Sequence, residues 1–173
     1  MSSLNEREYR QGVAAGAERQ ITNVAQKHQN RMGENAFSSP LEEWGAHIEG
    51  ACAELLVAKR LDLHFMGCLP NVDGGNDVGP YGVRFASRPD GELILRRHDR
   101  PGQIFILVAG AAPFGNIKGW IKGADGKREE WFRNRGVWDK KPKAFFVPQS
   151  ALNPDIEILK DPERLRRFLD GPK

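Results

Sequence analysis

Three residues in the middle of the sequence have side chains that could act on a phosphate group. Glu54 lies in an apolar stretch with helical spacing, Asp77 follows a pair of glycines, and Arg84 lies in a short β-like run. Two carboxylates that meet at one end of a sheet would bind a hard cation such as Mg²⁺ or Mn²⁺. An arginine beside that cation would stabilise the charge that develops on a phosphoryl transition state. The sequence therefore predicts Asp77 and Glu54 as metal ligands and catalytic residues, with Arg84 as a third catalytic residue.

Each of these three residues also has an ordinary structural interpretation. A glutamate on an amphipathic helix often forms a surface ion pair, and an aspartate among glycines often bonds the backbone of its own turn. An arginine in a half-exposed strand is often solvated or paired with a neighbouring acid. Both interpretations stay open for Glu54, Asp77 and Arg84 at this point.

The elements that must position these residues are a helix and several short strands. Ser39 as N-cap, Pro40 at the first helical position and Glu42 two residues later predict a helix that runs to about Leu61. Apolar runs bounded by glycine and proline predict strands, followed by a short helix behind Pro162; the strand ranges are 81–87, 92–97, 104–109, 118–122 and 144–148. This order is typical of an α+β fold with a central mixed or antiparallel sheet flanked by helices.

The first part of the chain differs in composition from the rest. Residues 5–32 are polar, and their small apolar residues recur at spacings of three and four, which predicts a long helix with a thin apolar stripe. We therefore divide the chain into an N-terminal helical arm (1–35) and a core domain (36–173). The arm is expected either to lie on the domain or to become ordered on a protein partner.

Basic residues are concentrated in the second part of the chain. Of the 26 lysines and arginines, nine lie in residues 1–95 and seventeen in the last 78 residues, where tryptophans and phenylalanines are interleaved with them. This combination suits a phosphate backbone and unstacked bases, so DNA is a predicted partner. The alternative is a solvated basic rim around a thin core. The candidate nucleic-acid-binding residues are Arg96, Arg97, Lys118, Lys122, Arg133 and Arg135.

Several classes of protein are not expected from this sequence. No apolar run approaches the length of a membrane span, and the first residues lack the basic and apolar regions of a secretory signal. Cys52 and Cys68 have no zinc-like spacing and are typical of free thiols in a reducing compartment. We therefore expect a cytoplasmic protein with no membrane partner; the sequence leaves a homodimer open.

An ordered set of short motifs resembles a known superfamily. The helix 50–59 with Glu54, the run Asn76–Gly79, the strand Tyr81–Arg84 and the segment Leu93–Asp99 are similar to motifs of PD-(D/E)XK nuclease-like proteins from phages and prophages. Gly119-Trp120-Ile121 and Phe146-Val147-Pro148 extend the match, which covers about residues 45–152. The resemblance implies a restriction-endonuclease-like core, a Mg²⁺ or Mn²⁺ cofactor and cleavage of DNA. If the gene is a phage gene, the location is the host cytoplasm.

The chain departs from the pattern of that superfamily at two positions. The second acid of the strand motif falls on Gly82, and Arg84 stands where the family has a lysine. Arginine can stabilise a phosphate but cannot act as a base at neutral pH. Glu92 or Asp99 could replace the missing acid.

Three functions therefore remain open from the sequence. The first is a metal-dependent DNA phosphodiester hydrolase, and the second is a catalytically inactive protein of that fold that binds nucleic acid. The third is a phage protein-interaction factor that docks through its N-terminal helix.

Overall fold

The fold is seen in a computed structural model that describes residues 2–25, 39–67, 76–134 and 143–171. The described helices are α1 (Glu6–Ala25), α2 (Pro40–Leu61), α3 (Gly123–Gly126) and α4 (Pro162–Asp170), with 3-10 turns η1 (Glu129–Trp131), η2 (Gln149–Ala151) and η3 (Ile156–Lys160). The strands are β1 (Ser2–Ser3), β2 (Tyr81–Ala86), β3 (Leu93–Leu95), β4 (Ile104–Ala109), β5 (Phe114–Lys122), β6 (Phe132–Arg133) and β7 (Ala144–Val147). These elements confirm the predicted α+β class.

The strands form two small sheets instead of the single central sheet that the sequence predicted. The larger sheet has the order β1-β5-β4-β2, in which only the β2–β4 pair is parallel, and the smaller sheet has the order β3-β7-β6. The difference arises because Leu93–Leu95 pair with β7 and not with the preceding strand β2. Strand β2 is therefore an edge strand of the larger sheet.

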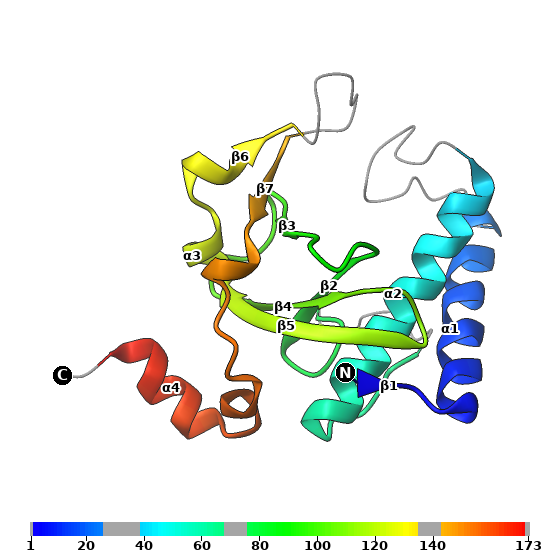
Figure 1. Ribbon diagram of the computed structural model, residues 1–173, viewed down its shortest axis with the longest axis horizontal. Coiled ribbons are helices and arrows are strands. Elements are labelled where there is room, and N and C mark those ends of the chain that lie inside the picture. Colours follow the sequence, from blue (N-terminus) through cyan, green and yellow to red (C-terminus); the bar gives the residue numbers. More distant parts are fainter. Residues whose placement is uncertain (1, 26–38, 68–75, 135–142, 172–173) are drawn as a thin grey trace.

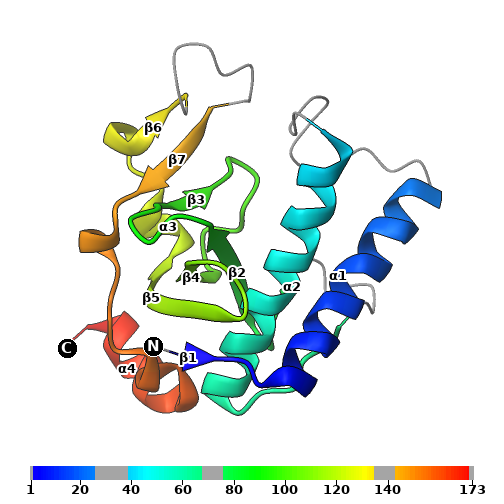
Figure 2. The same cartoon turned by 45° about the vertical axis from the view of Figure 1, so that its right-hand side comes forward.

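Each face of the larger sheet buries its own apolar cluster. Ile104, Ile106 and Val108 of β4 pack on the side of α2, whereas Phe105 and Leu107 pack on the side of the smaller sheet. This division follows from the alternation of side chains along a strand. Figures 1 and 2 show the resulting layers, with the two long helices on one side of the larger sheet and the smaller sheet on the other.

Helix α2 begins and ends where the sequence predicted. The Ser39 hydroxyl accepts a hydrogen bond from the Glu42 backbone N–H at 3.3 Å, and Pro40 occupies the first turn. After Leu61 the backbone turns at Asp62, which has φ of 57°. The helix is buried through its second half, which includes Glu54.

The described part of the predicted N-terminal arm consists of β1, which pairs with β5, and helix α1, which lies along α2 (Figures 1 and 2). The close approach depends on a glycine, because a Cβ added at Gly16 would lie 2.4 Å from the Ile48 Cα. Residues 26–35 of the arm lie outside the described residues. This packing places Arg19 of α1 beside α2, which matters for the predicted site.

Candidate functional site at the edge of β2

Asp77 lies against the edge of β2 that does not pair with β4. Its backbone N–H donates to the Tyr81 carbonyl at 2.8 Å, and its Oδ2 accepts a hydrogen bond from the Val83 N–H at 2.7 Å. The carboxylate therefore satisfies a backbone donor on an edge strand, where an unpaired N–H would be costly if buried. Asp77 thus has the backbone-bonding role that is common for an aspartate in a turn, and it has that role beside Arg84.

The Arg84 side chain extends from the face of β2 that points away from α2, and its guanidinium lies between two carboxylates. Its guanidinium lies 3.0 Å from Asp99 Oδ1 and 3.7 Å from Asp77 Oδ2. It also donates to the carbonyls of Ile94 and Val83, and its Cζ lies 4.7 Å from the centre of the Phe105 ring. Val83, the residue before Arg84, packs on the α2 side, as expected from the alternation of side chains along a strand. Arg84 is fixed by these contacts and links two acids across the site.

Glu54 is buried in α2 and is bound by an arginine that the sequence did not indicate. Two nitrogens of Arg19 lie 2.7 and 2.5 Å from the two carboxylate oxygens of Glu54. Arg19 also donates to the Gly67 carbonyl at 2.6 and 3.1 Å. A bidentate pair of this kind is among the strongest hydrogen-bonded contacts in proteins. Glu54 is thus in an ion pair, as its structural interpretation proposed, but its carboxylate is buried and Arg19 is only partly exposed.

Asp77 and Arg84 are in contact, and Glu54 is electrostatically coupled to both. Burial raises the pKa of Glu54 above its ordinary value of 4.5, and the pair with Arg19 opposes that rise. Asp77 raises the pKa of Glu54 further, whereas Arg84 lowers it. Charges influence a pKa in this way only when they are near. We call Glu54, Asp77 and Arg84, together with Arg19 and Asp99, the edge site.

An aromatic ring fills the space that the third acid of the superfamily motif would occupy. Gly82 pairs with Phe105 across the parallel strands, and a Cβ added at Gly82 would lie 2.7 Å from Phe105 Cδ1. The same Cβ would lie 3.2 Å from the Gln103 amide nitrogen, which donates to Asn76 Oδ1 at 2.9 Å. A carboxylate at position 82 would therefore require the buried Phe105 ring to move.

The predicted metal ligands do not fit a divalent cation in this arrangement. Both oxygens of Glu54 accept hydrogen bonds from Arg19, and Asp77 Oδ2 accepts one from Val83. Mg²⁺ requires several oxygen ligands in octahedral geometry, and a guanidinium already supplies the positive charge beside Glu54. Within the described residues, no group of three or more His, Cys, Asp or Glu side chains could hold a metal ion.

Asp99 has a different role from the replacement acid that the sequence suggested. Its Oδ2 accepts the Arg96 N–H at 2.8 Å, and its Oδ1 faces Arg84. The Lys127 ammonium donates to the carbonyls of Asp99 and Arg97, which holds this turn against the residues that follow α3. Glu92 is not part of the edge site, because it pairs with Arg133 at 2.6 Å.

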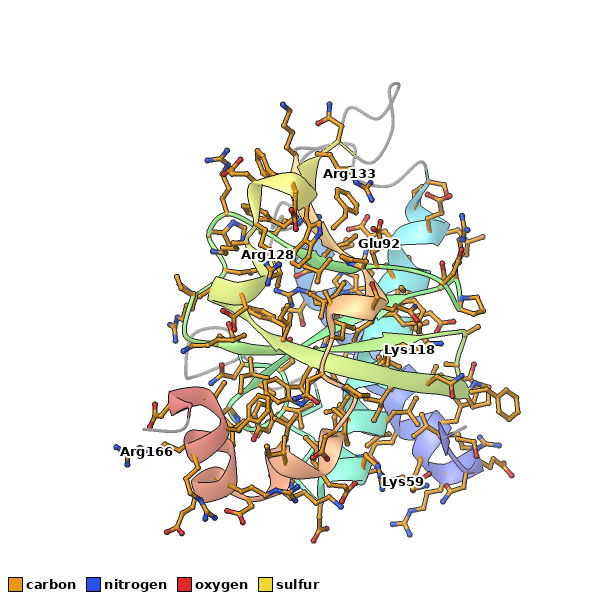
Figure 3. All side chains as sticks on the ribbon, turned by 60° about the vertical axis from the view of Figure 1, so that its left-hand side comes forward. Lys59, Glu92, Lys118, Arg128, Arg133 and Arg166 are labelled. Atoms are coloured by element: carbon orange, nitrogen blue, oxygen red, sulfur yellow. The ribbon has the colours of Figure 1, made fainter. Side chains whose placement is uncertain are left out.

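The structure places the predicted nucleic-acid-binding residues in different surroundings. Arg97 is exposed, with its Cζ 4.3 Å from the centre of the Phe132 ring. Arg96 is partly buried, and burial lowers its pKa. Lys118 and Lys122 are partly exposed on β5, and Arg135 lies outside the described residues. Arg133 lies beside Glu92, and Figure 3 shows both at the upper end of the molecule.

Arg128 lies over an aromatic ring, as Arg97 does. Nothing in the sequence distinguished Arg128 from the other basic residues near it. Its Cζ lies 4.9 Å from the centre of the Trp131 ring. Trp131 and Phe132 are consecutive, and the contacts of Lys127 join the turn of Arg97 to this segment. We call Arg97, Arg128, Trp131 and Phe132 the arginine–aromatic face; Figure 3 shows Arg128 at the segment around η1.

A cleft of about 1100 Å³ lies between α2 and the smaller sheet. Its described lining includes Phe85, Ile94 and Phe146, together with four carboxylates and two arginines. Both arginines are already paired, Arg88 with Asp90 and Arg133 with Glu92. The cleft is therefore acidic and does not suit a phosphate backbone.

Comparisons with known proteins add no relative to this description. Scans against models of protein families, curated proteins and solved structures each returned no match. Among the described residues, none of the helices combines the length and the apolar character needed to cross a membrane.

Proposed function

We propose that this chain is a nuclease-like protein that binds nucleic acid and does not cut it. The observation that supports this proposal is the different use of arginine in two regions. In the edge site, Arg19 and Arg84 are bound to carboxylates at 2.5 to 3.7 Å. On the arginine–aromatic face, Arg97 and Arg128 lie over aromatic rings and are exposed.

The loss of cutting is inferred from the edge site. A hydrolase of this type needs carboxylates that can accept a cation, and here Glu54 faces a guanidinium. The third acid is replaced by Gly82, and the Phe105 ring occupies the space in front of it. Arg84 cannot take a proton from water at neutral pH.

Binding is inferred from the charge of the segment that carries the arginine–aromatic face. Residues 96–143 contain twelve lysines and arginines against five acids, whereas the rest of the chain has more acids than bases. A cationic segment of this kind gains affinity for nucleic acid by releasing counterions from the phosphate backbone. Aromatic rings and arginines add contacts to bases.

The experiment measures binding and cleavage on the same preparation. Fluorescence anisotropy with labelled single-stranded and duplex DNA is recorded in EDTA and in Mg²⁺ over a range of salt concentrations. We expect binding that needs no metal and weakens steeply with salt. We expect the DNA to remain intact on a gel after incubation with Mg²⁺ or Mn²⁺. Metal-dependent cleavage would contradict the proposal that the chain does not cut DNA. Binding that does not change with salt would contradict the proposal that the phosphate backbone is bound through charge.

A charge-matched pair of variants locates the binding surface. R97E/R128E reverses two charges on the arginine–aromatic face and is expected to lower the affinity at least tenfold. R10E/R166E makes the same change in net charge at two exposed helix positions, each near an acid four residues away. We expect R10E/R166E to stay within about twofold of wild type, because its charges lie elsewhere on the molecule. Equal losses in both variants would refute a localised surface.

Metal-dependent hydrolysis of DNA is the second candidate, and one observation favours it. Glu54 and Asp77 are close enough for one carboxylate to raise the pKa of the other, which is typical of acids that share a site. This function would require Arg19 to release Glu54. The test is cleavage of labelled DNA in Mn²⁺ by wild type, D77N and D90N, where Asp90 pairs with Arg88 on the surface. The candidate requires that D77N alone abolishes cleavage.

A further inference from the structure

We propose that the arginine–aromatic face binds unpaired bases, so that the chain prefers single-stranded nucleic acid to duplex. This inference rests on the proposed function and names its substrate class. A guanidinium lying over an aromatic ring keeps its opposite face available for a planar partner. Bases in a single strand can be turned outward to stack on such a platform, whereas paired bases are stacked within the duplex.

The two rings that lie under the stacked arginines are themselves packed in the fold. Arg97 lies over Phe132, and Phe132 packs against the Phe145 ring of β7 with centres 4.8 Å apart. Trp131 supports Arg128 and packs on the apolar cluster between the two sheets. Arginine loses little freedom on binding when its plane is already oriented. The pair therefore forms a prepared platform.

The charges around the platform favour stacking over phosphate contacts alone. Arg96, Arg100, Lys122 and Lys127 are near in sequence to the stacked arginines, but Asp125, Glu129 and Glu130 are exposed in the same segment. Glu130 lies 3.9 Å from the Arg128 guanidinium. These acids weaken the attraction for a duplex, whose charge density is high. Stacking on Arg97 and Arg128 adds to the binding of a single strand, whose bases can turn outward, and a duplex does not gain this contribution.

Arg133 provides an internal contrast to Arg97 and Arg128. Its Cζ lies 4.5 Å from the centre of the Phe146 ring, so it is also stacked. However, Glu92 holds it at 2.6 and 2.8 Å, and it follows Phe132 on a strand, where successive side chains point to opposite faces. A stacked arginine that an acid holds through two short hydrogen bonds should contribute little to binding.

The experiment compares a labelled oligothymidine with a duplex of the same length by fluorescence anisotropy in EDTA. Wild type is expected to bind the oligothymidine at least tenfold more tightly than the duplex. R97K/R128K keeps both charges and removes both guanidinium planes. It should lose about tenfold in affinity for oligothymidine and stay within about twofold for the duplex. R133K, the matched control, should leave both affinities unchanged.

The outcomes separate this inference from the proposed function. Duplex binding that equals or exceeds single-strand binding would overturn the single-strand preference and leave nucleic-acid binding intact. An R97K/R128K variant that binds oligothymidine like wild type would overturn the role of the stacked arginines. No binding to either DNA would overturn the proposed function itself. Circular dichroism checks that each variant is folded, and the single variant R128K repeats the comparison with the smallest change.

Discussion

The edge site and the arginine–aromatic face use the same residue type for opposite purposes. At the edge site, Arg84 lies between Asp77 and Asp99, and its exposed fraction is 28%. On the arginine–aromatic face, Arg128 is 60% exposed and lies over an indole ring. A guanidinium surrounded by acids stabilises the fold and has little hydrogen-bonding capacity left for a ligand. A guanidinium over an aromatic ring can still contact a ligand through its charge and its exposed face.

The difference follows from where the acids lie in the fold. The packing of α1 on α2 brings Arg19 to Glu54, and the turn after β3 brings Asp99 to Arg84. Buried charges must be paired, so each arginine at the edge site is fixed by an acid that would otherwise be uncompensated. Around η1 the acids are exposed and solvated, so they do not bind the arginines as firmly.

The largest expected effect is the loss of stability on removing Arg84. R84A leaves Asp77 and Asp99 without their shared cation and removes a guanidinium from the Phe105 ring. We expect a loss of about 3 kcal/mol in the free energy of unfolding, at the low end for a broken buried pair because Arg84 is partly exposed. Urea denaturation of wild type and R84A measures this loss.

The matched control for R84A is R88A, which removes a guanidinium from an equally well-formed pair on the surface. Arg88 and Asp90 are 75% and 68% exposed, and such pairs contribute little to stability. R88A should therefore remain close to wild type. If R84A and R88A had the same midpoint in urea, the arginine of the edge site would not be structural, and the contrast between the two regions would disappear.

A second prediction concerns how tightly the edge site is packed. G82A places a methyl group 2.7 Å from the buried Phe105 ring and should lower the free energy of unfolding by about 1–3 kcal/mol. G50A changes a glycine of α2 that has no atom within 4 Å of its added Cβ. It should be neutral or stabilising by up to about 1 kcal/mol, because alanine favours a helix. A G82A protein as stable as wild type would mean that the edge site has room for a larger side chain.

Much of this arrangement could be predicted from local sequence. The cap at Ser39 and the helix behind Pro162 are set by residues close to one another in the chain, and both are confirmed. Such signals depend on local hydrogen bonding and periodicity. The same local signals also placed Asp77 and Arg84 next to each other.

The partners of the edge site could not be predicted in this way. Arg19 and Glu54 are 35 residues apart, and nothing in the polar sequence of α1 distinguishes Arg19 from the other arginines there. Their contact is created by the packing of two helices. The division of the strands into two sheets likewise depends on the long-range pairing of β3 with β7. The spacing of acids and bases predicts which charges are available, and tertiary packing decides which of them remain exposed.

The smallest expected effect is a pH dependence of stability that originates at Glu54. Burial raises the pKa of Glu54 above 4.5, so the folded protein keeps this proton to a higher pH than the unfolded chain. Between the two pKa values the folded state binds more protons, and the free energy of unfolding therefore falls as the pH rises through that window. E54Q has no such proton. The stability of wild type relative to E54Q should decline as the pH rises above 4.5 and then level off.

Urea midpoints of wild type and E54Q across this pH range measure that difference, and R10Q serves as a control for an exposed arginine–glutamate pair. The sign of the slope decides which force dominates at the edge site. If the bidentate contact with Arg19 outweighed burial, the pKa of Glu54 would lie below 4.5, and the relative stability of wild type would instead fall as the pH dropped below that value. A declining curve above 4.5 would mean that Glu54 is held at an energetic cost that Arg19 only partly offsets. That result would distinguish the edge site from the arginine–aromatic face, where the charges are solvated and no such cost is expected.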